Sequence, residues 1–242
     1  MSRARCVFAL VLLLSAQSAL AGPSIALDIG HSSASPGAVS ARGRGEFYFN
    51  RDLAVHLAAA LADKRFEVRV INLDGAETGL ETRTAKALGA DLFLSVHHDS
   101  AQPQYLSAWT FKDERHHYTD RFAGFSLFVS RRNPDPARSL ACASAVGSAL
   151  RQNGFAVSLH HAEPIEGENR PLADAVNGVY YYDDLVVLRS ATQPAILLEA
   201  GVIVNRDEEA LLSRIDLQQS MSRAVAQGLA QCLRSGQSLL PE

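Results

Sequence analysis

Hydrophobic positions in the first hundred residues alternate between the period of a strand and the period of a helix. After Glu46, apolar residues recur at steps of three and four as far as about Lys64, which predicts a helix with one buried face. Shorter apolar or alternating runs predict strands. The elements predicted in this part of the chain are strands at 25–27, 68–70 and 91–97 and helices at 46–64 and 78–88. Such alternation is typical of a parallel α/β sheet.

The rest of the chain also predicts strands and helices, interrupted by two irregular intervals. It predicts strands at 125–129, 185–188 and 195–198 and helices at 136–152 and 215–233. Residues 102–122 and 160–182 follow neither period, and we interpret the first as a loop or a surface insertion that overhangs the end of the preceding strand. The chain is 47% hydrophobic, so we expect one compact α/β domain with a substantial core.

The amino terminus has the layout of a secretory signal peptide. Arg3 and Arg5 precede a short apolar run, and a small-residue cleavage pattern ends at Ala21. We therefore divide the chain into a signal peptide at 1–21 and a mature domain at 22–242. The apolar run is shorter than the roughly 20 residues that span a bilayer, and no later stretch replaces it, so we expect no membrane anchor. The predicted destination is the periplasm, reached by secretion across the inner membrane.

Charge and cysteine content narrow the classes of partner. The net charge is −3 and no basic run reaches five residues, so nucleic acid is not an expected partner. Cys142 and Cys232 belong to the mature domain, in a compartment that permits disulfides. Nothing in the sequence brings their Cα atoms within the roughly 7 Å that a bridge requires. We expect two separate buried cysteines on different helices and leave their pairing open.

Three predicted strands end near a histidine or a glutamate. His31 follows the first strand, His97 ends the third, and Glu199 follows the strand at 195–198. Ligands of an open α/β sheet bind outside the carboxyl ends of parallel strands, so these side chains can converge on one crevice. Glu46, which opens the helix after the His31 loop, can reach the same place. Two imidazoles with carboxylates match the donor set of a catalytic Zn²⁺ that keeps one position for water.

Short motifs surround these residues in a defined order. They are Asp28-Ile-Gly-His31, Pro36-Gly37-Ala38, Glu46, Ser95-Val-His97 and the segment 194–205. In this order they resemble the motifs of the zinc-dependent N-acetylmuramoyl-L-alanine amidases of the amidase-3 type, over nearly all of the mature chain. The resemblance implies a single α/β domain whose mostly parallel central sheet is flanked by helices. It implies one zinc ion per chain, held by His31, Glu46 and His97. It also implies that Glu199 is the catalytic acid that activates or positions water.

The sequence departs from the family pattern at two places. Ser32 and Ser33 stand where the family usually has two glycines. Serine lacks the freedom of glycine at positive φ, so the loop either runs differently or makes its tight turn at Gly37. The pair His97-His98 stands where one histidine is usual. Neighbouring strand residues face opposite sides, so only one of the pair can face a metal, and the Ser-Val-His pattern favours His97.

Other polar residues have more than one interpretation. Asp28 either orients a ligand histidine through its second ring nitrogen or caps a loop. Arg170 and Arg189 are candidate contacts for substrate carboxylates, and surface salt bridges are the alternative. His160 and His161 lie in an irregular polar segment, where we expect solvated side chains.

The predicted activity is hydrolysis of the amide between the lactyl group of N-acetylmuramic acid and the L-alanine of the peptidoglycan stem peptide. Peptidoglycan is the expected partner, with a protein activator as a further one. A first alternative is another zinc-dependent cell-wall peptidase, because the metal site does not choose the scissile bond. A second is a catalytically inactive wall-binding scaffold, which the changed loop at 32–33 permits.

Overall fold

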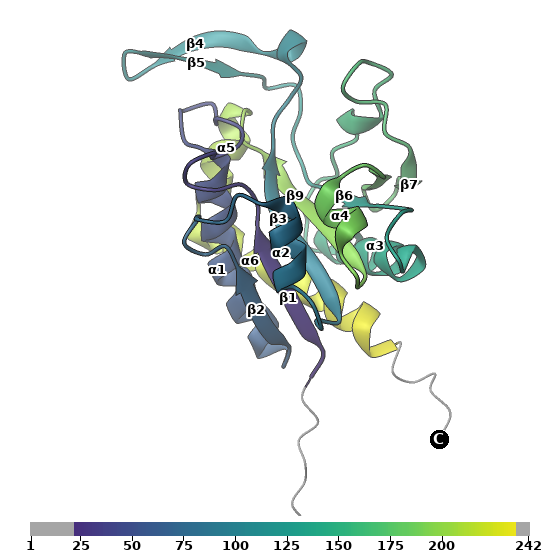
Figure 1. Ribbon diagram of the computed structural model, residues 1–242. Coiled ribbons are helices and arrows are strands. Elements are labelled where there is room, and N and C mark those ends of the chain that lie inside the picture. The colour runs from purple at the N-terminus through teal and green to yellow at the C-terminus, as the bar shows by residue number, and fades with distance from the viewer. Residues whose placement is uncertain (1–21, 236–242) are drawn as a thin grey trace, which may run out of the picture.

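Seven strands form the central sheet of the computed structural model, which describes residues 22–235. They are β1 (Ser24–Ile29), β2 (Glu67–Ile71), β3 (Leu92–Asp99), β6 (Ser126–Val129), β7 (Leu172–Asp174), β8 (Val179–Tyr181) and β9 (Ala195–Val202). Their order is β2-β1-β3-β9-β6-β8-β7 (Figure 1). Only the β9-β6 and β7-β8 pairs are antiparallel. The mostly parallel sheet is confirmed, whereas the predicted signal peptide lies outside the described residues.

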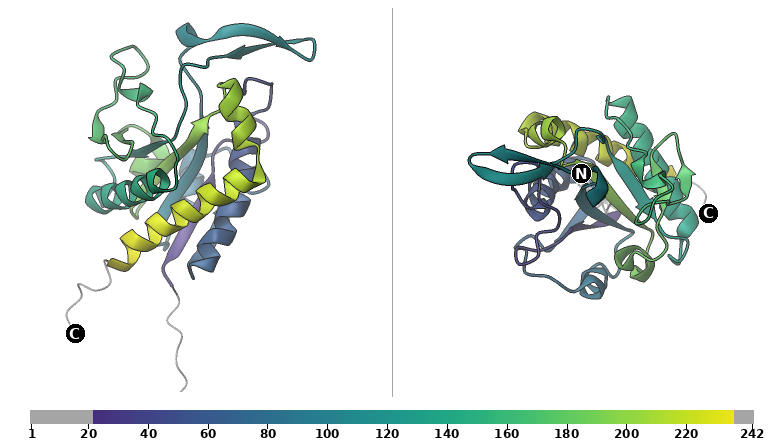
Figure 2. Two further views of the ribbon diagram at one scale, coloured as in Figure 1. Left: turned by 180° about the vertical axis from the view of Figure 1, so that it is seen from behind. Right: turned by 90° about the horizontal axis from the view of Figure 1, so that it is seen from above.

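Helices cover both faces of this sheet. One face carries α1 (Glu46–Asp63), α3 (Pro136–Gln152) and α6 (Ile215–Ser235), and the other carries α2 (Leu80–Lys86) and α4 (Val186–Ser190) (Figures 1 and 2). Strand residues alternate between the two faces, so Leu27 packs in the larger core with α1 and α6, and Ala26 packs in the smaller core with α4. Within residues 22–235, no helix is long and apolar enough to cross a membrane.

Short elements account for most differences from the predicted secondary structure. The apolar residues at 185–188 belong largely to α4 and not to a strand. A short apolar run fits a buried strand and a buried helical turn equally well, so periodicity could not separate them. The interval 160–182 contains the edge strand β7 and its neighbour β8, and α5 (Arg206–Leu212) follows β9. Each of these elements is too short to show a period.

The segment 102–122 contains a separate hairpin, so of the two interpretations the surface insertion is the one observed. After a 3₁₀ turn at Pro103–Tyr105, β4 (Ser107–Phe111) pairs antiparallel with β5 (Glu114–Tyr118) outside the central sheet (Figure 1). The Trp109 indole N–H donates to the Ala41 carbonyl oxygen at 2.8 Å, and the Arg206 guanidinium carbon lies 3.8 Å from the centre of the Tyr118 ring. The hairpin therefore packs toward α5, and the overhang of the strand end by this segment stays a prediction.

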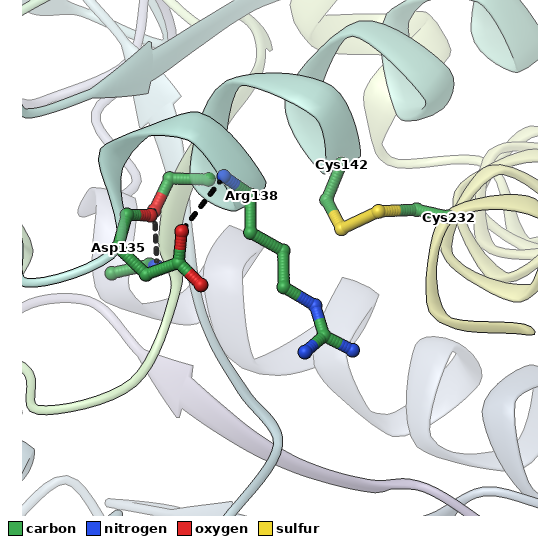
Figure 3. Close-up of a disulfide and its surroundings, with 6 residues drawn as sticks. Asp135, Arg138, Cys142 and Cys232 are labelled. Atoms are coloured by element: carbon green, nitrogen blue, oxygen red, sulfur yellow. Dashed lines mark hydrogen bonds between the residues drawn. A yellow bond between two sulfur atoms is a disulfide. The ribbon is translucent and has the colours of Figure 1, made fainter. Parts of the chain in front are cut away.

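Cys142 and Cys232 form a disulfide between α3 and α6, so the expectation of two separate cysteines was wrong (Figure 3). Their Cα atoms are 5.1 Å apart. The helices approach closely because α6 has no side chain at Gly228, where a Cβ would lie 2.5 Å from the Val146 Cα. Gly228 and Cys232 are one turn apart on α6, as Cys142 and Val146 are on α3. The bridge thus follows from a close helix contact that the sequence alone does not reveal.

We expect the double variant Cys142→Ala/Cys232→Ala to lose about 2–4 kcal/mol of unfolding free energy, because the bridge closes a long loop of the unfolded chain. The cysteines are 90 positions apart. Urea unfolding monitored by circular dichroism measures the loss. A reductant should lower the stability of the wild-type chain by a similar amount and leave the double variant unchanged. Equal sensitivity of both proteins to the reductant would contradict the prediction.

Candidate metal centre

Side chains from three elements meet at the carboxyl end of the sheet. His31 lies in the loop after β1, Glu46 in the first turn of α1, and His97 near the end of β3. The Glu46 Oε2 atom lies 2.9 Å from His31 Nε2, and Glu46 Oε1 lies 2.9 Å from His97 Nδ1. One potential ligand atom from each residue lies within 4.8 Å of the other two. The structure therefore brings together the three residues that the resemblance implies as ligands.

The chemistry of this group suits a zinc-type cation. Two imidazole nitrogens and a carboxylate oxygen form a three-ligand set that leaves a position for water or substrate. Burial alone would raise the pKa of Glu46, but hydrogen bonds with His31 and His97 hold it well below its usual range. The backbone N–H groups of Ala38 and His98 donate to the two carboxylate oxygens at 3.1 and 3.3 Å. The carboxylate is thus ionised and held in a fixed orientation.

The loop that carries His31 makes a tight turn at Gly37, one of the two predicted solutions. Gly37 has a φ of +77°, and a Cβ there would lie 2.5 Å from Glu46 Oε2 and 2.6 Å from His31 Cδ2. Ser32 is buried, and its hydroxyl accepts the backbone N–H of Ser35 at 3.0 Å. The Ser32 hydroxyl thus stabilises this loop. The conformational freedom of a glycine is needed farther along the chain, at Gly37.

Asp28 does not bind either ligand histidine in the described part of the chain, which corrects that interpretation. Its carboxylate accepts hydrogen bonds from the Arg83 guanidinium at 3.0 Å and from the Ser95 hydroxyl at 2.8 Å. Arg83 is 2% exposed and also donates to the carbonyl oxygens of Ile29 and His31. Asp28 therefore supports the His31 loop through Arg83. Sequence reasoning missed Arg83, because an arginine on a short helix gives no sign that it is buried.

The second histidine of the pair is turned away from the group. His98 faces the opposite side of β3 from His97, as the alternation of strand side chains predicts. Its Nδ1 atom lies 2.8 Å from Asn50 Oδ1, and its ring centre lies 5.6 Å from that of Phe49. Burial lowers the pKa of His98 to about 3, so the ring is neutral at physiological pH. Of the pair, only His97 belongs to the candidate metal group.

Glu199 enters the site from β9, where it is the register partner of His97 on β3. Its Oε2 atom is buried and has no hydrogen-bond partner among residues 22–235. Burial, together with the negative charges of Asp99 and Glu46, raises the pKa of Glu199 well above its usual range. A buried carboxyl group with an uncommitted oxygen is typical of a proton carrier.

Two cavities of about 370 and 350 Å³ open beside these residues. The residues common to both walls are His31, His97, Leu185 and Leu197. The smaller cavity is also lined by Glu199 and Arg170, and the Arg170 guanidinium carbon lies 3.4 Å from the centre of the Tyr182 ring. Arg189 is exposed on α4 and lines neither cavity. Of the two candidate arginines, only Arg170 has a place beside the site.

A second polar cluster borders the smaller cavity. The Asp99 Oδ2 atom lies 3.2 Å from His160 Nε2 and 2.8 Å from His161 Nε2. The exposed fractions of His160 and His161 are 5% and 7%, so the expectation of solvated side chains was wrong. Sequence reasoning missed the cluster because it joins β3 to an irregular segment about 60 positions later. The only local signal was Asp99, which follows His97 by two residues and so belongs to the same face of the strand.

Gly37→Ala should weaken metal binding by about 10-fold or more, the effect typical of a changed support of a ligand. The added methyl group would press on both His31 and Glu46. Gly89→Ala is a matched control, because Gly89 has a φ of +83° and a Cβ there meets nothing within 4 Å. Both variants carry the about 1–2 kcal/mol cost of a left-handed alanine. Zinc titration of both variants measures the difference in affinity. Equal affinities would show that the contact of a Cβ at position 37 with His31 and Glu46 does not affect metal binding.

Comparisons with known proteins agree with this geometry. The family model for N-acetylmuramoyl-L-alanine amidase matches residues 25–231. AmiA of Salmonella typhimurium is 25% identical over 228 residues, which cover 85% of this chain and 74% of AmiA, and AmiA of Escherichia coli is 24% identical with the same coverage.

Among solved structures, the amidase Ami1 from Mycobacterium smegmatis has a TM-score of 0.70 at 20% identity, covering 89% of this chain and 99% of that one. The catalytic domain of CwlV from Bacillus (Paenibacillus) polymyxa has a TM-score of 0.65 at 24% identity, covering 88% and 99%. These likenesses concern the fold. Because the family match spans nearly all of the described residues, this chain belongs to the N-acetylmuramoyl-L-alanine amidase family.

Proposed function

We propose that this chain hydrolyses the amide between N-acetylmuramic acid and L-alanine in peptidoglycan with water activated at a zinc site. The observation that carries the proposal is the convergence of His31, Glu46 and His97 beside Glu199 at one strand end. Membership in the amidase family supports the same bond as the target. A zinc ion held by this group would polarise the amide carbonyl and lower the pKa of water toward about 7.

Glu199 is the proposed proton carrier. An amide nitrogen must be protonated to leave, so one group has to take a proton from water and deliver it to the alanine nitrogen. Burial and two neighbouring carboxylates raise the pKa of Glu199, which favours the protonated form needed for delivery. A cation at the adjacent group would favour the ionised form needed to accept the proton. These opposed influences allow one carboxyl group to serve both steps.

Arg170 is the proposed contact for the stem peptide. Its guanidinium stacks on Tyr182 in the wall that also contains Glu199, so it can meet a carboxylate of a bound peptide close to the reacting amide. The same pocket would decide between this amidase and another zinc-dependent wall peptidase. Mass spectrometry of digested sacculi separates them, because only the amidase releases stem peptides that begin with a free L-alanine amino group.

Location and partners follow from the same assignment. The signal-like residues 1–21 support export to the periplasm, where peptidoglycan is accessible. A protein activator is a further proposed partner, since the structurally similar CwlD amidase from Clostridioides difficile was solved in complex with the GerS lipoprotein. An inactive wall-binding scaffold is less well supported, because the proposed ligands and Glu199 are all present and grouped together.

His97→Ala should remove one bound zinc per chain and abolish release of stem peptides, whereas His98→Ala should keep that zinc. His97 is a member of the group, and His98 faces Asn50 on the other side of β3. Metal analysis of both purified variants provides the measurement, with thermal unfolding as a check on folding. If His98→Ala loses the zinc and His97→Ala retains it, the assignment within the pair is wrong.

Glu199→Gln should fold, keep its zinc and release stem peptides about 10²- to 10⁴-fold more slowly, because glutamine cannot carry the proton. Glu114→Gln, on the exposed hairpin, is a control for the loss of a carboxylate. Zinc content, thermal unfolding and peptide release should be measured on the same samples. A variant that releases peptides at a wild-type rate would rule out Glu199 as proton carrier, and one that loses zinc would make it a ligand.

A further inference from the structure

The second polar cluster has the composition of a metal site that the amidase reaction does not require. Asp99 ends β3, and His160 and His161 belong to the 3₁₀ turn His160–Ala162. One potential ligand atom from each residue lies within 4.8 Å of the other two, as in the group formed by His31, Glu46 and His97. Both groups contain two imidazoles and one carboxylate. In both, the ring nitrogens approach the carboxylate oxygens at 2.8–3.2 Å.

Each imidazole of this cluster also has a polar partner at its second ring nitrogen. The second ring nitrogen of His160, Nδ1, lies 2.7 Å from Ser158 Oγ, and that of His161 lies 2.8 Å from Glu168 Oε2. Metal-binding histidines usually make such a bond through the nitrogen that does not face the ion, because it fixes the tautomer and the ring orientation. Aromatic rings hold the two imidazoles from the side: Phe122 stacks on His160 at 4.8 Å, and Phe128 meets His161 at 4.9 Å.

One atom of the cluster is unsatisfied. His160 is 5% exposed, and its Nε2 atom has no hydrogen-bond partner within residues 22–235, although Asp99 Oδ2 is only 3.2 Å away. A buried polar atom without a partner is costly, and native structures usually supply a water, an ion or a ligand for it. Here the unsatisfied nitrogen points toward a carboxylate oxygen that His161 Nε2 also approaches. A single cation between the three atoms would satisfy all of them.

The charge around the cavity also favours a cation. The wall of the smaller cavity contains the carboxylates of Asp99 and Glu168 besides the Glu199 carboxyl group, and Arg170 is its only arginine or lysine among the described residues. The stem peptide that we propose as substrate carries further carboxylates, which these side chains would repel. A cation bound by the cluster would offset part of this negative charge at the place where the peptide enters.

We propose that Asp99, His160 and His161 bind a second zinc-type divalent cation, separate from the one at His31, Glu46 and His97. Asp99 and His161 line the cavity, so a fourth position on the ion faces the substrate space. Asp99 lies two positions after His97, which corresponds to about 7 Å along a strand. This exceeds the about 3.5–4 Å between the ions of a bridged two-metal site, so the geometry points to two independent ions that face one cavity.

Metal counting on single-site variants tests the proposal. After incubation with Zn²⁺ and removal of loosely bound ion, we expect two zinc equivalents per wild-type chain and one in either His31→Ala or His160→Ala. The combined His31→Ala/His160→Ala variant should hold none. His117→Ala is the matched control, because His117 is exposed on β5 and belongs to neither group, and it should hold two. Cys142 and Cys232 are joined in the disulfide, so their thiols do not contribute to the count.

A second measurement covers the case in which His160→Ala fails to fold. Glu168→Gln keeps all three ligands but changes the partner of His161, so the second site should bind Co²⁺ about 10- to 100-fold more weakly while the first is unchanged. In His31→Ala, added Zn²⁺ should still raise the melting temperature, because only the second site remains. Neither readout depends on peptidoglycan hydrolysis, so failure of the proposed function would leave them interpretable.

The main alternative to a second metal ion is a proton on His161. Burial lowers the pKa of His161, but the charges and hydrogen bonds of Asp99 and Glu168 outweigh it and raise that pKa to about 9. A protonated His161 would satisfy both carboxylates without a metal. In that case the wild-type chain would hold one zinc, His160→Ala would hold the same amount, and Zn²⁺ would not stabilise His31→Ala. Any of these results would overturn the proposal.

Discussion

The parallel pairing of β3 with β1 on one side and β9 on the other is the constraint on which the site depends. It places His97 directly beside Glu199 and brings the end of β1, and with it His31, to the same edge of the sheet. Strand side chains alternate, so a register shift of one residue would present His98 in place of His97. The buried apolar residues of these strands fix the register, because the same shift would move every one of them to the wrong face.

Two kinds of buried charge at this edge have different roles. Asp28 and Arg83 form a closed pair, at 1% and 2% exposure, whose hydrogen bonds end on the backbone of the His31 loop. Because the two charges cancel, the role of this pair is to hold the His31 loop in position. Removing one partner would leave an uncompensated buried charge. Glu46 and Glu199, by contrast, have no lysine or arginine as an ion-pair partner in the described part of the chain. The negative charge of Glu46 is available for a cation, and the raised pKa of Glu199 makes its carboxyl group available for proton transfer.

The sequence predicted what depends on local pattern or on motif order. The long helices were found because several turns repeat one apolar face, and the helix at 136–152 was predicted with its observed ends. His31, Glu46 and His97 were predicted as ligands because the motifs around them resemble those of the amidase family and because each lies at or near the end of a predicted element. The pairing of Cys142 with Cys232 was missed because it depends on how closely two helices approach.

The parts of the site that the sequence did not predict depend on tertiary contacts. Arg83 acts on a loop more than 50 positions away, and His161 reaches Asp99 across 62 positions. Neither residue has a neighbour in the sequence that hints at its partner. An irregular polar segment is the default description of a surface loop, so burial of two adjacent histidines in one requires a partner on another element. That partner becomes visible only when β3 and the segment at 160–168 are placed side by side.

The two faces of the sheet divide stability from chemistry. The face covered by α1, α3 and α6 holds the larger apolar core and the disulfide, and no residue of the candidate metal group other than Glu46 comes from its helices. The other face has the smaller core and opens into the cavities near α4. The segment between β6 and β9 adds His161 and Arg170 to the cavity wall without taking part in the β1-β3-β9 ladder. Changes in that segment can therefore alter what the cavity binds while the ladder keeps His97 and Glu199 in register.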